Sequence, residues 1–227
     1  MAIVHFLLGG VCHQLPEHAL WFEGRALPVC ARCTGTFVGA VVALAVLWAL
    51  GSGPRSELPG RGPLYVLGAL GALWALDGVN SLVSGLRGRP WLYETTNALR
   101  LITGVGCGLG MGALLFPVYH HSLWRDVVAE PVLARPAHLL ALLGAGAALA
   151  GVALGWRAAP YAPWWIAAVS SVLVVFALTN TVLVALVWHE RGRCTRALQT
   201  MPYWLAGAAL GLAEMGAMAL VRRLIMG

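Results

Sequence analysis

Six long apolar segments, separated by short polar connectors, make up most of this chain. They cover residues 34–50, 63–83, 95–117, 137–155, 163–188 and 202–221. A helix needs about 20 mostly apolar residues to cross the hydrocarbon core of a bilayer, and each segment is close to that length. Because lipid cannot hydrogen-bond to backbone amides, segments of this kind have to be helical. The pattern predicts an all-α integral membrane bundle of six transmembrane helices.

The connectors carry residues that end helices and anchor them at a membrane surface. Glycine, proline and arginine recur there, and tryptophans lie near several span ends. Residues 1–11 are too short for another span and lack the basic start and the cleavage site of a signal peptide. We expect residues 1–33 to form a short interfacial Cys/His segment and residues 34–221 to form the bundle. Residues 1–227 would then be a single membrane domain.

The composition supports a lipid environment. Of the 227 residues, 59% are hydrophobic and 11% are charged, and the mean hydropathy is +0.78. So few charges could not cover the surface of a soluble protein of this size. The net charge of +6 comes from arginines near the ends of the apolar segments, which favours interfacial anchoring over nucleic-acid binding. We therefore expect membrane lipid as a partner, and no nucleic acid.

The charge distribution does not decide the orientation of the bundle. Six spans place both termini on one side of the membrane, which we call the Cys side because the first three cysteines precede the first span. Seven arginines flank each side, so the positive-inside rule favours neither. We expect the cell (inner) membrane with cytoplasmic termini, since nothing in the sequence resembles an export signal.

Sulfur and imidazole groups are concentrated just before the first span. Zinc prefers tetrahedral sulfur and nitrogen ligands, and a Cys-x-x-Cys pair supplies two of them from one turn. We predict a metal site of this kind, with zinc as the cofactor. The predicted ligands are Cys12, His13, Cys30 and Cys33. Since Cys12 and His13 are adjacent, one of them could instead be an outer group or a general base, and His18 is a further candidate ligand.

The same cysteines also allow redox chemistry. Cys30 and Cys33 would lie at the N-terminus of the first spanning helix, where the helix dipole and Arg32 stabilise a thiolate. Cys12 would then be the resolving thiol, and a membrane quinone would be the natural electron acceptor. The cysteines could also form a structural disulfide or remain inert buried thiols. The sequence does not choose among a metal site, a redox pair and a purely structural role.

Polar side chains within the spans gather toward the Cys side. Asp77 and Asn80 lie near the end of the second span, and Asn97 and Arg100 lie near the start of the third. Ionisable groups at membrane depth are costly and usually face the bundle interior. We predict a polar pocket below the cysteines, with Glu214 of the last span as a further member. The candidate catalytic residues are Asp77, Asn97 and Arg100.

Two roles are possible for the charged pair in this pocket. Asp77 could act as an acid or base while Arg100 binds an anionic group. Alternatively, Asp77 and Arg100 form a buried ion pair that only fixes helix packing. Glycines at 104, 108 and 112 of the third span predict close helix packing rather than nucleotide binding, because no strand precedes them.

Histidines and a cysteine also gather at the opposite membrane face. They are His120, His121, His138, His189 and Cys194. Metal binding by the adjacent pair at 120 and 121 is one interpretation. An interfacial role is the simpler one, because an imidazole ring is amphipathic and suits the end of a span.

The polar motifs resemble the signature of an uncharacterised prokaryotic family of multi-pass membrane proteins, domain of unknown function 2085. The matching blocks are Cys12-His13-Gln14-Leu-Pro16, Pro28-Val-Cys30-Ala-Arg-Cys33-Thr-Gly35, Asp77-Gly78-x-Asn80 and Asn97-x-x-Arg100-x-x-Thr103-Gly104. The resemblance covers roughly residues 11–112, and the last three helices agree only in length and hydropathy. It departs after Pro16, where an arginine is expected and this chain has Glu17-His18. The family has no established activity, so the resemblance implies where the site lies but no reaction.

These patterns predict a multi-pass membrane protein with an interfacial zinc site over an intramembrane polar pocket, acting on a lipid-type substrate. A membrane thiol–disulfide oxidoreductase that uses Cys30 and Cys33 is one alternative. A small transporter is a second, although the polar residues lie mostly in one half of the membrane rather than through its full depth. The sequence does not decide whether the protein is an enzyme, and it names no substrate.

Overall fold

The computed structural model describes residues 2–53, 55–156, 158–188 and 192–226. Six helices in it are long and apolar enough to cross a membrane, which confirms the predicted fold class. They are α2 (Ala31–Ala49), α3 (Arg61–Arg87), α4 (Asn97–Leu123), α5 (Pro136–Gly155), α6 (Tyr161–Val187) and α7 (Met201–Met226). The third span continues past Pro117, where the prediction ended it. A proline is tolerated inside a membrane helix because neighbouring groups satisfy the freed backbone.

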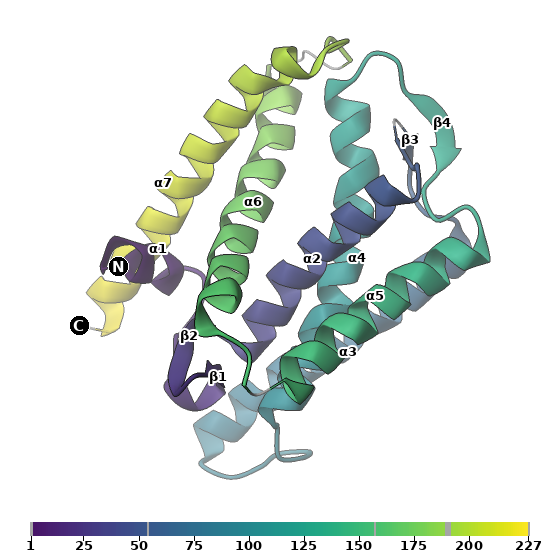
Figure 1. Ribbon diagram of the computed structural model, residues 1–227. Coiled ribbons are helices and arrows are strands. Elements are labelled where there is room, and N and C mark those ends of the chain that lie inside the picture. Colours follow the sequence, from purple (N-terminus) through teal and green to yellow (C-terminus); the bar gives the residue numbers. More distant parts are fainter. Residues whose placement is uncertain (1, 54, 157, 189–191, 227) are drawn as a thin grey trace.

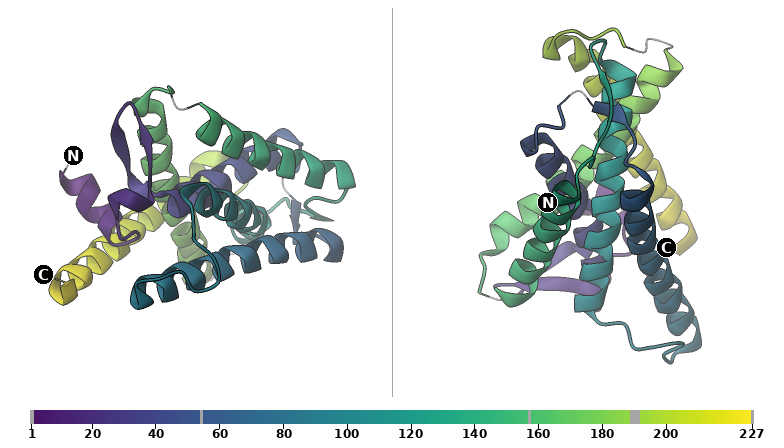
Figure 2. Two further views of the ribbon diagram at one scale, coloured as in Figure 1. Left: turned by 90° about the horizontal axis from the view of Figure 1, so that it is seen from below. Right: turned by 90° about the vertical axis from the view of Figure 1, so that its right-hand side faces the viewer.

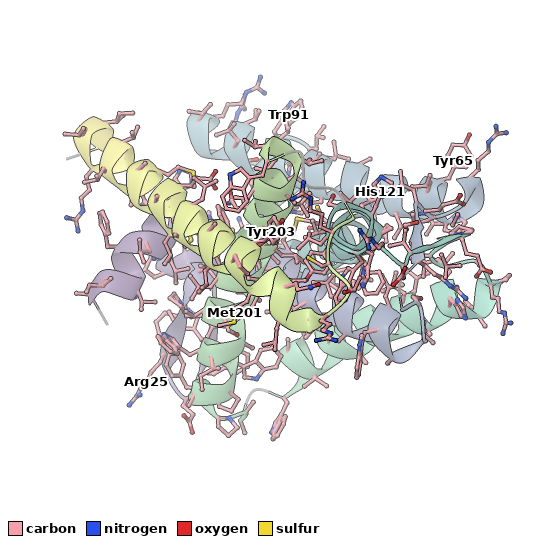
Figure 3. All side chains as sticks on the ribbon, turned by 90° about the horizontal axis from the view of Figure 1, so that it is seen from above. Arg25, Tyr65, Trp91, His121, Met201 and Tyr203 are labelled. Carbon is pink, nitrogen blue, oxygen red and sulfur yellow. The ribbon has the colours of Figure 1, made fainter. Side chains whose placement is uncertain are left out.

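Helices α2 and α4 form the centre of the bundle (Figure 1). Helices α6 and α7 pack together on one side of this pair, and α5 packs against both central helices. Helix α3 packs mainly against α4 and presents most of its surface to lipid, as Tyr65 shows by pointing outward with 77% of its surface exposed (Figure 3). The central pair therefore positions the groups at its Cys-side end, while the outer helices cover it.

Glycines allow the backbones of α2 and α4 to approach closely. A Cβ atom added to Gly104 would lie 2.3 Å from the carbonyl oxygen of Arg32. One added to Gly108 would lie 2.2 Å from that of Thr36. Any side chain at these positions would force the two helices apart. The glycines of the third span thus have the predicted packing role.

Residues 2–30 fold on the Cys side as a short helix followed by a hairpin (Figure 2). Helix α1 (Ala2–Gly9) packs against α7, and the 3-10 turn η1 (Pro16–His18) leads into the hairpin. The antiparallel strands are β1 (Ala19–Phe22) and β2 (Arg25–Cys30). The hydropathy pattern does not predict this hairpin.

The hairpin turn does have a local sequence signal. Glu23 and Gly24 both have positive φ, at 48° and 72°, as a two-residue hairpin turn requires. A residue that tolerates this conformation followed by glycine, between two apolar runs, is a hairpin pattern. The turn fixes the register of the strand that ends at Cys30.

The tip of the hairpin is attached to the start of α6. The Phe22 and Trp164 rings stack with their centroids 5.0 Å apart. The Tyr161 backbone N–H donates to the Glu23 carboxylate at 3.0 Å, a favourable place for a negative charge because it is a helix N-terminus. The second half of the chain therefore holds the segment that carries Cys30.

The opposite end of the bundle is closed by smaller elements. Strands β3 (Arg55–Glu57) and β4 (Val128–Pro131) pair in parallel there, and the 3-10 turn η2 (Ala197–Thr200) precedes α7. Both chain ends lie on the Cys side, as an even number of spans requires (Figure 1).

Candidate metal centre

Three cysteines from three separate elements come together on the Cys side. The Sγ atoms of Cys12, Cys30 and Cys33 all lie within 4.8 Å of one another, and none is in a disulfide. Cys12 follows α1, Cys30 ends β2, and Cys33 is in the first turn of α2. A tetrahedral zinc ion with Zn–S bonds of about 2.3 Å holds its sulfur ligands about 3.8 Å apart. The three thiols therefore fit a zinc ion with little movement.

Backbone N–H groups point at two of the sulfur atoms. Cys12 Sγ accepts from the backbone N–H of Cys30 at 3.2 Å and of Gln14 at 3.4 Å. Cys30 Sγ accepts from the N–H of Cys33 at 3.4 Å and caps the N-terminus of α2. Such donors and the helix dipole stabilise negative charge on sulfur, whether the thiolate is free or bound to a metal.

The metal-free cluster concentrates negative charge on Cys30. Hydrogen bonds from the Cys12 and Cys33 thiols lower the pKa of Cys30 to about 2. The same bond with Cys30 raises the pKa of Cys12. Hydrogen bonds among the three sulfur atoms thus favour the thiolate form of Cys30, and a bound cation would displace the remaining thiol protons.

Gln14 joins the two segments that carry Cys12 and Cys30. Its Nε2 donates to the carbonyl oxygen of His5 in α1 at 3.1 Å and to that of Pro28 in β2 at 3.0 Å. Its backbone is in the left-handed region, with φ of 56°. The glutamine of the Cys-His-Gln motif therefore has a positioning role that its spacing alone did not indicate.

Arg222 of α7 holds the backbone around Cys12. Its guanidinium donates to the carbonyl oxygens of Gly9 at 2.8 Å, Cys12 at 2.6 Å and His13 at 2.7 Å. These carbonyls lie at and just beyond the C-terminal end of α1, where helical partners are missing. The sequence indicated only an interfacial arginine here, because nothing in the spacing relates residue 222 to residue 12.

The two histidines near the cluster are outside the group of three sulfur atoms. The side chain of His13 is exposed, and its backbone rather than its ring is engaged, by Arg222. His18 is half-buried, and burial together with the positive charge of Arg100 lowers its pKa. Three of the four predicted ligands therefore converge, and His13 does not join them.

Asp77 pairs with Arg32 and not with Arg100, so the alternative of a structural Asp77–Arg100 ion pair is wrong. Arg32 Nε donates to Asp77 Oδ2 at 3.0 Å, its Nη2 makes a short ion pair with the same oxygen, and Tyr93 Oη donates to Oδ1 at 3.0 Å. The Asp77 side chain is fully buried. Arg32 reaches it from α2, and these donors occupy both carboxylate oxygens. Because Arg32 belongs to the Cys-x-x-Cys motif, the pair ties the cysteine cluster to α3.

Asn97 and Arg100 form a second polar group at the start of α4. Arg100 is buried, with 9% of its surface exposed, and its Nη1 donates to Asn97 Oδ1 at 2.9 Å. Asn97 Nδ2 donates to the carbonyl oxygens of Glu17 at 2.9 Å and Ala19 at 3.1 Å, which links α4 to the hairpin segment. The buried Nε of Arg100 has no hydrogen-bond partner among the described residues. Arg100 therefore keeps an unused donor that suits an anionic group.

Two other predicted pocket residues have structural partners. Asn80 is fully buried and binds the loop before α4, donating to the carbonyl oxygen of Tyr93 at 2.9 Å and accepting from the N–H of Leu92 at 2.9 Å. Glu214 accepts from Asn180 Nδ2 at 2.8 Å, which joins α6 to α7. Glu214 is thus bound in a helix contact of its own rather than to Asp77 or Arg100.

Comparison with known proteins confirms the family resemblance. Residues 12–114 match the family described as "Predicted membrane protein (DUF2085)". An uncharacterized protein of Methanocaldococcus jannaschii is 29% identical over 115 residues, which cover 51% of this chain and 67% of that protein. An uncharacterized protein of Methanothermobacter thermautotrophicus is 27% identical over 110 residues, which cover 48% of this chain and 88% of that protein. No solved structure matches the chain.

The family match and the site coincide along the sequence. The matched residues 12–114 contain the three converging cysteines, the Arg32–Asp77 pair and Arg100. Arg222, which holds the Cys12 segment, lies outside that range.

Proposed function

We propose that this chain, whose residues 12–114 match a family of predicted membrane proteins, is a multi-pass membrane protein that binds zinc through Cys12, Cys30 and Cys33. The observation that supports this most directly is the approach of three free thiols, from three elements, to within 4.8 Å of one another. Thiolate ligands select zinc over the harder divalent cations, magnesium and calcium. Backbone N–H groups already directed at the sulfur atoms add to the fit.

A three-sulfur site would leave one tetrahedral position for a water molecule or a substrate, as catalytic zinc sites do. Zinc there would polarise a bound oxygen. Arg100, oriented by Asn97, would bind an anionic group through its unused Nε. Asp77 would act by holding the cysteine motif through Arg32. We further propose a lipid-type substrate, because the cluster lies where the chain enters the membrane.

We place the cysteine cluster on the cytoplasmic face of the cell (inner) membrane. Free thiols that lie this close together persist in a reducing compartment and tend to oxidise outside it. With six spans, both termini would then lie in the cytoplasm.

Thiol–disulfide exchange is a second candidate function. It is favoured by the pKa of about 2 for Cys30 and by the position of this residue at the N-terminus of α2. Oxidation would form a Cys30–Cys33 bond and transfer two electrons and two protons to a membrane quinone, which becomes the quinol. Cys12 would be the resolving thiol.

Metal analysis with thiol counting on the detergent-purified protein separates the two functions. We expect one zinc ion per chain and three cysteines that react with an alkylating reagent only after a chelator has removed the metal. Cys33→Ser should weaken zinc binding at least about a hundredfold, since each ligand contributes about 3 kcal/mol. Cys107→Ala is the matched control because Cys107, in α4, is outside the cluster, and it should leave zinc binding unchanged.

Two outcomes of these measurements would contradict the zinc site. A metal-free preparation in which Cys30 and Cys33 interconvert between thiol and disulfide would refute the zinc site and support the redox function. An unchanged zinc affinity in Cys33→Ser would show that the metal is bound elsewhere.

A further inference from the structure

A basic cavity lies between α1 and the last turns of α7. Its volume is about 550 Å³, and its polar lining consists of His5, Gln14, Arg222 and Arg223. No aspartate or glutamate lines it. The function proposed above uses none of these four side chains as a metal ligand.

The positive charges in this cavity have no acidic partner among the described residues. The ion pairs among the described residues, Arg32–Asp77 and Arg55–Glu130, involve no residue of this cavity. Arg222 donates to three backbone carbonyls, which hold the guanidinium in place without neutralising it. The Arg223 guanidinium lies 4.7 Å from the centroid of the Phe6 ring. Two neighbouring guanidinium groups without a counter-charge favour an anion, and phosphate suits the donors of a guanidinium group.

A second cavity of about 440 Å³ adjoins the first and is mainly apolar. The two share Gly9 and Arg222 as lining residues, and the second is bounded by Met218, Val221 and Ile225 of α7. These apolar side chains are on the outer surface of a spanning helix, with Val221 54% and Ile225 76% exposed. A charged compartment therefore meets an apolar one at Arg222.

We propose that the two cavities bind an anionic phospholipid, with its phosphate between Arg222 and Arg223 and one acyl chain along Met218 and Val221. The ligand has to be amphiphilic because the polar and apolar compartments are adjacent, and anionic because the cavity charges are unpaired. Both arginines lie near the end of a spanning helix, at the level where lipid phosphates are found. The second cavity is also bordered by Cys12 and His13, but none of the contacts proposed for the lipid uses a zinc ligand or a bound metal ion.

The lipid also has a direct structural route to the metal centre. Arg222 binds the carbonyl oxygens of Cys12 and His13, so it is shared between the lipid site and the segment that carries Cys12. For this reason the test changes Arg223, whose guanidinium lies over the Phe6 ring of α1, whereas Arg222 binds the carbonyl oxygens of Cys12 and His13. We expect its exchange to leave the three cysteines in place, and the zinc content of the variant checks this.

The experiment measures lipid binding to the full-length protein in neutral detergent micelles. Phosphatidylglycerol and phosphatidylcholine with identical acyl chains are titrated, and retained lipid is quantified by native mass spectrometry. We expect phosphatidylglycerol to bind at least about fivefold more tightly, and Arg223→Gln to remove about fivefold of its affinity, as about 1 kcal/mol per arginine implies. Arg87→Gln, in the last turn of α3 on the same membrane side, is the matched control and should have no effect.

Three results would overturn the proposal. They are equal binding of the two lipids, a loss of phosphatidylglycerol affinity in Arg87→Gln equal to that in Arg223→Gln, or displacement of phosphatidylglycerol by an equal concentration of inorganic phosphate.

If Arg223→Gln does not fold, His5→Asp tests the same cavity, because His5 is exposed and a carboxylate there should also lower phosphatidylglycerol affinity about fivefold. Zinc content, measured on the same samples, keeps failure of the lipid site distinct from failure of the zinc site.

Discussion

The two ends of the bundle carry similar residues, but only one end brings them together. On the Cys side, three thiols lie within 4.8 Å of one another. The opposite end holds His120, His121, His138 and Cys194, while His189 lies outside the described residues. Among the described residues, none of these joins a group of three potential ligands. The His120 ring nitrogen Nδ1 instead lies 2.8 Å from the Phe116 carbonyl oxygen, and the ring packs on the Phe116 ring.

The difference lies in how each end is held. On the Cys side, a helix and a hairpin lie against the membrane helices and are fixed there by Gln14, Arg222 and the contact of Glu23 with α6. At the opposite end, the histidines are on helix termini, and the β3–β4 pair carries neither histidine nor cysteine. Ligand residues alone do not make a site, because their convergence also needs a segment that brings them to one point.

The largest expected difference between the ends concerns their ion pairs. Asp77→Asn should lower the free energy of unfolding by about 3 kcal/mol, because it leaves the partly buried Arg32 without its counter-charge. At the opposite end, Arg55 and Glu130 are 3.4 Å apart, and Glu130 is 57% exposed. Glu130→Gln should therefore cost less than about 1 kcal/mol. Unfolding by SDS titration in mixed micelles measures both values.

The double variant Arg32→Met/Asp77→Leu distinguishes pairing from independent effects. Removing both charges should cost less than the sum of Arg32→Met and Asp77→Leu, because each single variant leaves one buried charge without a partner and the double variant leaves none. Strict additivity, or equal losses at the two ends of the bundle, would contradict the assigned role of the Arg32–Asp77 pair.

The sequence predicts how deep each polar side chain lies in the membrane better than it predicts which neighbouring helix the side chain faces. Hydropathy places Asp77, Arg100 and the cysteines toward the same membrane face. The Cys-x-x-Cys spacing with Cys12 upstream predicts a shared site, and the three thiols do converge. Depth does not determine the rotation of a helix about its axis. Arg32 and Arg100 enter the same region, and only the packing of α2 against α4 decides that Arg32 reaches Asp77.

The supporting residues could not be found from local patterns for a different reason. Arg222 and Cys12 are far apart in the sequence, and the contact depends on α1 crossing α7. Gln14 acts through two backbone carbonyl oxygens. Every residue has such an oxygen, so the sequence does not indicate which residues Gln14 binds. The hairpin is the exception, since the Glu23-Gly24 turn has a local sequence signal.

A smaller difference, in zinc affinity, is expected between variants of two glycines on the same helix. A Cβ at Gly104 would lie 2.3 Å from the Arg32 carbonyl oxygen, and one at Gly112 would lie 2.5 Å from that of Ala40. Gly104→Ala and Gly112→Ala should each lower the free energy of unfolding by about 1–3 kcal/mol. Only Gly104→Ala displaces the cysteine motif, so it alone should weaken zinc binding, by about tenfold.

Calorimetric zinc titration and SDS unfolding on the same samples check this pair. Gly71→Ala in α3 is the control, because nothing lies within 4 Å of its added Cβ, and it should not lower stability. Equal zinc affinities in Gly104→Ala and Gly112→Ala would show that the metal centre is insensitive to the α2–α4 distance.

The smallest expected effect concerns pH and His18. Burial, and next the positive charge of Arg100, lower the pKa of His18 below its usual value of 6.5, while Glu17 and Cys30 act in the opposite direction and Arg32 in the same one. The unfolded chain therefore takes up a proton at a higher pH than the folded protein does. Stability should fall as the pH drops below about 6.5, with no contribution from His18 above it.

His18→Gln should make the unfolding free energy less dependent on pH between about pH 7 and 5, because glutamine does not titrate. The effect is small because water screens a half-buried ring. Measurements with a chelator present exclude proton competition for zinc. If His18→Gln keeps the slope of the parent protein, the ring lies in a more polar environment on the Cys side than its position beside Arg100 indicates.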